Sequence, residues 1–161
     1  MRPDKHRHIG IWILFLLDQF KGEIALYKSI LIPVDMAHVA KLNTMIDSAL
    51  MQSDSNSKIM LLNVVEEIPS WASVELPRGI VDKSVRSSLE ELQVLAGSTD
   101  TKMDVEVRTG HPYKTILEVA EEKNVDLIIV ASHQPGLQDY FLGSTAAKVV
   151  RHAKCSVQVV R

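Results

Sequence analysis

The sequence predicts an α/β protein: a doubly wound sheet of five parallel strands with helices on both faces. One observation is that short apolar runs alternate with longer stretches whose apolar residues recur at helical spacing. Another is that the runs at 30–34 and 58–65 are almost continuously apolar, which is typical of parallel strands buried on both faces. With 161 residues, the chain is long enough for one domain with a sizeable core.

Charge and composition exclude some classes of partner. The formal net charge is −2 and only 5% of the residues are aromatic, so neither bulk electrostatics nor base stacking favours a nucleic acid. Cys155 is the only cysteine, which excludes an intramolecular disulfide and favours a reducing cytoplasm. We expect Cys155 to be a small buried residue and not a reactive thiol.

The first 26 residues differ from the rest. A basic start, MRPDKHRH, is followed by an apolar run from Ile9 to Leu17, which is shorter than the roughly 20 residues that span a bilayer. This order resembles a signal peptide, but no small-x-small cleavage site follows. We therefore expect an N-terminal extension at 1–26, either an upstream translation start or a membrane-touching helix, and one domain at 27–161. Membrane contact is expected only if the extension belongs to the native protein.

The expected elements alternate along the domain. Strands are predicted at 30–34, 58–65, 103–108, 125–130 and 157–160, and helices at 37–51, 81–95, 112–123 and from 143 onward. The stretch 103–108 alternates apolar and polar residues, as an edge strand does. Pro112 suits the first turn of its helix, because an N–H there has no partner within the helix. The irregular connection at 66–80 is either a flap over a crevice or a simple surface loop.

A strand, a loop and a helix start follow one another in the order of an anion site. The strand at 125–130 leads through a polar loop, 131–141, to a helix that begins at Gly143, Ser144 and Thr145. The first N–H groups of a helix lack partners and carry partial positive charge, so phosphate is their usual ligand. Gly143 lets a ligand approach the backbone, and the hydroxyls cap the helix or donate to phosphate. The alternative is a helix capped by Ser144 without any ligand.

Asp35 belongs to the same edge of the predicted sheet. The strand at 30–34 runs into this acid where a βα loop begins. In a doubly wound sheet, ligands bind outside the carboxyl ends of the strands, where the winding reverses. If the strands at 30–34 and 125–130 are neighbours, Asp35 and residues 131–133 face one crevice.

The chain resembles the universal stress protein family in four segments: ILIPVD, LLNVVEE, Gly110-His111-Pro112 entering a helix, and DLIIVASH with LGSTAAKVVRHAKCSVQVVR. The resemblance covers Tyr27 to Arg161 and is greatest to small single-domain bacterial members with a Ser-His-x-Pro loop. It implies a Rossmann-like sheet of the adenine nucleotide alpha hydrolase-like type, with strand order 3-2-1-4-5. It also implies ATP or a related adenine nucleotide as ligand, with or without magnesium.

The same resemblance implies the roles of single residues. Asp35 would accept a hydrogen bond from a ribose hydroxyl and could hold magnesium through water. Val64 would offer backbone groups to the adenine, and Val130 would pack on the base. The full set of expected contacts is Pro33, Val34, Asp35, Val64, Val130, Ala131, Ser132, His133, Gly143, Ser144 and Thr145. The last six would follow the phosphates.

The loop after residue 130 departs from the family's nucleotide pattern, in which Gly, two residues, Gly and nine residues precede Gly and Ser or Thr. Ala131 and Gln134 stand at the first two glycine positions, and the loop is one residue shorter. Ala131 adds only a methyl group. Gln134 could narrow the phosphate channel or change how the loop turns, whereas Pro135-Gly136 restores a tight turn. No catalytic residue and no metal ligand is assigned, and without a GxxxxGK[ST] motif or an arginine finger any ATP hydrolysis would be slow.

The last strand, Ser156 to Arg161, would be an edge with unpaired backbone groups. In the family this strand pairs with its two-fold mate, so the resemblance implies a homodimer; a covered edge in a monomer is the alternative. The implied function is a cytoplasmic, ATP-binding regulatory or protective module of the stress response. The alternatives are a nucleotide-free interaction protein that acts through its dimer surface and a slow ATPase or autophosphorylating enzyme.

Overall fold

The computed structural model describes residues 27–67, 79–99, 101–132 and 142–161. One sheet holds the five strands β1 (Ser29–Pro33), β2 (Lys58–Val65), β3 (Asp104–Thr109), β4 (Leu127–Ala131) and β5 (Ser156–Val160). Their order is β3-β2-β1-β4-β5, and every neighbouring pair is parallel. The predicted fold class and strand order are therefore confirmed. The expected extension at 1–26 and most of the connection at 66–80 lie outside the described residues.

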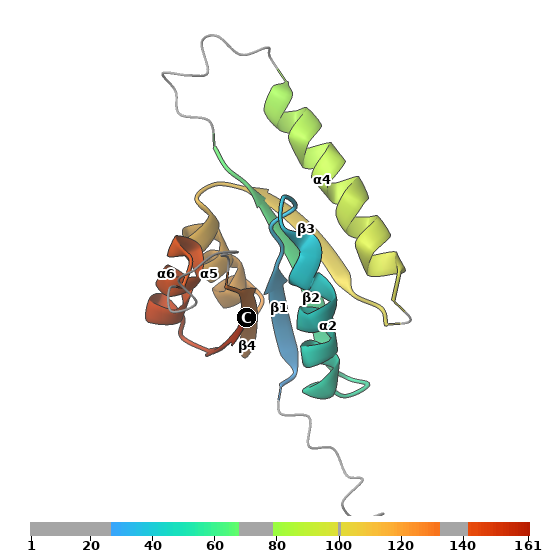
Figure 1. Ribbon diagram of the computed structural model, residues 1–161, viewed down its shortest axis with the longest axis vertical. Helices are drawn as coiled ribbons and strands as arrows, with labels where there is room; N and C mark the ends of the chain where they lie inside the picture. Colours follow the sequence, from blue (N-terminus) through green and yellow to red (C-terminus); the bar gives the residue numbers. More distant parts are fainter. Residues whose placement is uncertain (1–26, 68–78, 100, 133–141) are drawn as a thin grey trace, which may run out of the picture.

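The helices lie on both faces of the sheet (Figure 1). One face is covered by α4 (Ile80–Gly97) and by α2 (Leu42–Met51), which follows the 3-10 turn η1 (Val39–Lys41); the other face is covered by α5 (Pro112–Glu122) and α6 (Ser144–His152). Right-handed crossovers require this division, because the strand order runs from β1 to β3 in one direction and from β4 to β5 in the other. Among the described residues, no helix has both the length and the apolar character needed to cross a bilayer.

The central strands supply side chains to the core on both faces. Successive residues of β1 point to opposite faces, so Leu31 packs in the layer of α5 and α6, whereas Ile30 and Ile32 pack in the layer of α2 and α4. All three side chains are at most 1% exposed. Burying a side chain of this size stabilises the fold by about 1.5–3 kcal/mol, so the continuous apolar runs hold the three layers together.

The first helix begins later than its predicted start at residue 37. Asp35 forms a tight turn at this point: its carbonyl accepts the N–H of His38 at 2.9 Å, and its carboxylate accepts the N–H of Ala37 at 3.0 Å. Aspartate favours such turns because its short side chain reaches the backbone two residues on. Val39 fits the helical spacing of the apolar residues in the predicted helix 37–51, yet it lies in η1 and is 40% exposed.

The connection that enters α5 requires glycine. Gly110 has φ +146°, and a Cβ there would lie 2.5 Å from Oγ1 of Thr115, so a larger residue would be strained and would clash. Pro112 occupies the first turn of α5, as predicted. The Gly-His-Pro segment is therefore explained by the backbone path from β3 into the helix.

Candidate functional site

The carboxyl ends of β1 and β4 meet where the winding of the sheet reverses. The two strands pair in parallel, with Ile30 opposite Leu127 and Leu31 opposite Ile128. Asp35 follows the end of β1 and Ser132 follows the end of β4. The condition on which the predicted crevice depends, that these strands are neighbours, is therefore fulfilled, and this is the place where doubly wound sheets bind ligands.

The carboxylate of Asp35 is held from two sides and remains open to solvent. Oδ1 accepts the N–H of Ala37 at 3.0 Å, and Oδ2 lies 2.9 Å from Nδ1 of His38. The side chain of Asp35 is nevertheless 65% exposed. A carboxylate has about four acceptor positions, so two hydrogen bonds leave it able to accept from a ligand.

Val34 anchors the loop that carries Asp35. Its N–H donates to the carbonyl of Leu62 at 2.8 Å, and its carbonyl accepts from Nδ2 of Asn63 at 2.9 Å. Asn63 is only 6% exposed, so this amide fixes the path of the loop from within the protein. Sequence reasoning missed Asn63, although a polar residue inside the otherwise apolar run 59–65 was a signal for such a role.

The remaining expected contacts of the base lie on the same edge. Pro33 is the last residue of β1. The side chain of Val130 is 4% exposed within the layer of α5 and α6, which leaves it little surface for the expected contact with a base. Leu62 directs its carbonyl toward β1, and amides two residues apart along a strand point the same way. The backbone of Val64 therefore faces the space beyond the end of β1, and its role toward a base stays a prediction.

Lys41 connects the two loops that flank this edge. Its ammonium donates to the carbonyl of Ser132 at 3.0 Å, while the N–H of Ser132 donates to the carbonyl of Val160 at 2.8 Å. The exit of β4 is thus fixed by η1 on one side and by β5 on the other. Sequence reasoning missed this contact, because nothing local to Lys41 indicates a partner so far along the chain.

The start of α6 lacks the Ser144 cap that was the alternative to a phosphate site. Gly143 is the N-cap residue and no side chain caps the helix; Ser144 is the first helical residue and is exposed, so the cap by Ser144 is not formed. Leu142 and Ala146 pack in the same cluster as Val130, which brings the start of α6 against the end of β4. His133 and the loop residues Gln134, Pro135 and Gly136 lie outside the described residues.

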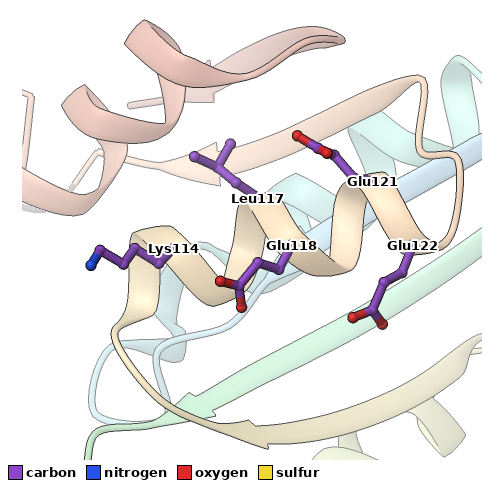
Figure 2. A pocket seen from close by; sticks show the side chains of 5 residues that line it. All are labelled: Lys114, Leu117, Glu118, Glu121 and Glu122. Atoms are coloured by element: carbon purple, nitrogen blue, oxygen red, sulfur yellow. The ribbon is translucent and has the colours of Figure 1, made fainter.

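Two surface hollows in the described structure lie elsewhere. Figure 2 shows one on the outer face of α5, lined by Lys114, Leu117, Glu118, Glu121 and Glu122. Its volume is about 400 Å³. Two of its three carboxylates are engaged in ion pairs, between Glu121 and Lys154 at 2.9 Å and between Glu122 and Arg108 at 2.9 Å. The other, of about 600 Å³, lies between the stretches 50–59 and 101–104 at the amino ends of β2 and β3. Neither hollow includes Asp35 or Ser132.

Cys155 lies just before β5, at the amino ends of the strands and away from Asp35 and Ser132. Its side chain is half-buried beside α6 and not fully buried as expected, and burial raises the pKa of its thiol. Within the ranges that the structure describes, no three His, Cys, Asp or Glu side chains gather closely enough to hold a metal ion.

Comparison with known proteins agrees with this architecture. The sequence model of the universal stress protein family matches residues 26–161. The chain belongs to this family. Universal stress protein G of Salmonella typhimurium is 32% identical over 145 residues, which cover 84% of this chain and 100% of that protein. The resemblance noted in the sequence is therefore confirmed.

Solved structures show the same universal stress protein fold. The hypothetical protein MJ0577 has a TM-score of 0.69 and 24% identity over 83% of this chain and 95% of its own. A universal stress protein in complex with cAMP has a TM-score of 0.62 and 20% identity over 84% of this chain and 97% of its own. At these identities the similarity shows the fold alone.

Proposed function

We propose that this universal stress protein binds ATP or a related adenine nucleotide at the carboxyl ends of β1 and β4. The observation that carries the proposal is the pairing of these strands, which brings Asp35 and Ser132 to the point where the winding reverses. A family member of the same fold is known in complex with cAMP, which supports an adenine nucleotide as the ligand class. In its host cell the protein would act in the stress response as a regulatory or protective module.

The expected contacts divide between the two ends of the nucleotide. Asp35 would accept a hydrogen bond from a ribose hydroxyl, because its exposed carboxylate retains acceptor positions. Val64 would meet the adenine through its backbone, and Pro33, Val34 and Val130 would border the base. The phosphates would follow Ala131, Ser132 and His133 to the amides at Gly143, Ser144 and Thr145, where no side chain caps the helix. Magnesium, where it accompanies the phosphates, would contact Asp35 through water.

No residue is proposed as a catalyst. Phosphoryl transfer needs a positioned water and cations on the transferred group. Lys41 is a cation at this edge, but its ammonium already donates to the carbonyl of Ser132. We therefore expect ATP turnover to be slow, and phosphate release by the wild type should not exceed that of a His133→Ala variant.

Substitution of Gly143 tests the phosphate end of the site. Gly143 has φ −56° and ψ 154°, a conformation that other residues adopt, so Gly143→Val should fold. Its side chain would stand between the phosphates and the amides of α6. We expect the affinity for ATP, measured by isothermal titration calorimetry, to fall by roughly tenfold or more.

Gly97→Val is the matched control, because Gly97 lies at the end of α4 and a Cβ there has nothing within 4 Å. This variant should bind ATP as the wild type does. Unchanged affinity in Gly143→Val would refute the phosphate site, and absence of ATP binding by the wild type would refute the proposed function.

A nucleotide-free interaction protein is the second candidate. The observation in its favour is that Ala131 and Gln134 stand where the family's nucleotide pattern has its first two glycines. Under this alternative, added ATP would leave the melting temperature unchanged, whereas a ligand at a hundred times its Kd stabilises a protein by about 2.7 kcal/mol.

We also propose a homodimer that forms through β5 and a cytoplasmic location. β5 is an edge of the sheet in the single chain, with half-buried Val157 and Val159 on one face and Val160 on the other. A second β5 would satisfy its outer backbone groups and cover apolar surface. The single cysteine favours a reducing compartment.

A further inference from the structure

His38 contacts the carboxylate that the proposed function places against the ribose. Its Nδ1 lies 2.9 Å from Oδ2 of Asp35, and the two residues are three apart in sequence. The turn between them is closed by the backbone, because the N–H of His38 donates to the carbonyl of Asp35 at 2.9 Å. The ring is therefore brought to the carboxylate by the local path of the chain.

The two oxygens of Asp35 are held by different donors. The N–H of Ala37 reaches Oδ1 at 3.0 Å, and the imidazole reaches Oδ2. A carboxylate with a single partner can still rotate about its last bond, whereas two partners on opposite oxygens fix the plane of the group. The acceptor positions that face solvent are then fixed in direction before any ligand arrives.

A carboxylate without these two partners would lose its rotational freedom only when a ligand binds. Asp35 is 65% exposed and His38 is 50% exposed, so packing alone does not immobilise them. Ordering an exposed side chain during binding costs affinity, and a group ordered in advance avoids that cost. The backbone N–H belongs to any chain that makes this turn, but the second donor depends on histidine at position 38.

We propose that His38 is a positioning residue of the nucleotide site: through Nδ1 it orients the carboxylate of Asp35 toward the ribose hydroxyls and so favours ribonucleotides over ligands that lack them. The inference rests on the proposed function. Because His38 acts through Asp35, its contribution depends on the sugar and not on the base or the phosphates.

Two substitutions separate the donor from the ring. His38→Phe keeps a planar ring and removes the donor. His38→Asn keeps a nitrogen donor bonded to the same carbon position as Nδ1. The side chain of His38 is half exposed, so the cost of either substitution to stability should be small, and the melting temperature of each variant checks this.

The affinities for ATP and for 2′,3′-dideoxy-ATP are measured by calorimetry for the wild type and both variants. We expect His38→Phe to weaken ATP binding about fivefold, the size of one net hydrogen bond, and to leave the dideoxy ligand unaffected. His38→Asn should restore binding of ATP to within about twofold of the wild type. In an Asp35→Ala background, His38→Phe should have no further effect.

Three results would overturn the inference while nucleotide binding stands. One is an equal loss for both ligands in His38→Phe, and another is a His38→Asn variant as weak as His38→Phe. The last is a wild type that binds both ligands with the same affinity, because Asp35 would then not contact the ribose. A wild type that binds neither ligand would remove the proposed nucleotide site and this inference with it.

Discussion

The two edges of the sheet differ in the side chains that flank them. β3 and β5 are both edge strands of similar length, and each has one row of backbone groups without a neighbouring strand in the single chain. Edge strands invite pairing with other chains, and charged side chains beside an edge oppose it. The edge with fewer charged side chains is therefore the one suited to a partner strand.

The β3 edge carries charges. On the face shared with α5, Glu106 and Arg108 form an ion pair with each other. Arg108 also meets Glu122 at 2.9 Å, and Lys123 meets Glu106 at 3.1 Å. A second strand at this edge would have to approach a network of charges and remove part of its water, which is unfavourable.

The β5 edge carries valines at the corresponding positions. Val157 and Val159 pack with the layer of α5 and α6, and Val160 packs with the layer of α2. The described part of β5 has one hydrogen-bonded polar side chain, Gln158, which contacts Gln52 at 2.7 Å and Ser48 at 2.8 Å. The β5 edge therefore lacks the protection that β3 has, in agreement with the proposed homodimer.

A proline in β5 is the test of the two edges with the largest expected effect. Ser156 and Val160 make backbone hydrogen bonds toward β4, so by alternation the N–H of Val159 points away from the sheet. Val159→Pro removes that donor without breaking the β4 ladder. We expect a monomer at micromolar concentration, measured by analytical ultracentrifugation, because a strand-paired dimer needs this edge.

Val107→Pro is the matched control on β3. The N–H of Gly110 donates to Val65 of β2, so by the same alternation the N–H of Val107 points outward, and Val107 is half buried as Val159 is. This variant should keep the association state of the wild type. Dissociation by Val107→Pro, together with an intact dimer in Val159→Pro, would reverse the assignment of the two edges.

Removing the charges of β3 should make the two edges more alike. In a variant with both Glu106→Val and Arg108→Val, β3 would present apolar side chains beside unpaired backbone groups. We expect species larger than the wild-type oligomer in light scattering, increasing with protein concentration. The double variant Glu121→Val and Lys154→Val removes an exposed ion pair away from this edge and should not associate further. If both variants behave alike, charge on β3 does not protect the edge.

Acid should lower the free energy of unfolding through the charged β3 edge, with a smaller effect than the substitutions above. Burial alone would raise the pKa of Glu106, but hydrogen bonds from Arg108 and Lys123 outweigh it and hold the pKa below its ordinary value. A depressed pKa stabilises the fold above the unfolded value, and this contribution is lost as pH falls through the folded value. We expect a loss of about 1 kcal/mol or less between roughly pH 5 and pH 3.

Glu106→Gln checks the origin of that loss. Its free energy of unfolding, from urea titrations at each pH, should fall less steeply in this range than that of the wild type. Glu118→Gln, on the outer face of α5, is the control and should follow the wild type. Identical slopes for Glu106→Gln and the wild type would show that the charges at β3 contribute nothing to acid sensitivity.

Much of the fold could be predicted because its signals are local. The run 58–65 became β2 with the same bounds, and Pro112 marked the first turn of α5. Asp35 and Gly143 could be singled out as candidates because one ends an apolar strand and the other precedes a helix. The adjacency of β1 and β4 came from the family resemblance, since periodicity does not state which strands are neighbours.

Local signals also have limits. Val39 fits helical spacing, yet it is exposed because the turn at Asp35 delays the helix. The contact of His38 with Asp35 depends on the shape of that turn, which the pattern of apolar residues does not describe. The role of each residue in binding a nucleotide stays a prediction.

The sequence by itself determined the strands, the helices and the strand and helix ends that border the candidate site, because hydrophobic periodicity, proline and glycine act over a few residues. Only the tertiary structure decided how those ends are held. Lys41 meets Ser132 across 91 positions of sequence, and Asn63 holds the loop of Val34 from a neighbouring strand. Such contacts depend on strand register and on the packing of helices against the sheet. A polar residue in an apolar run signals that Asn63 has a buried role, but the partner of neither Asn63 nor Lys41 can be read from the sequence.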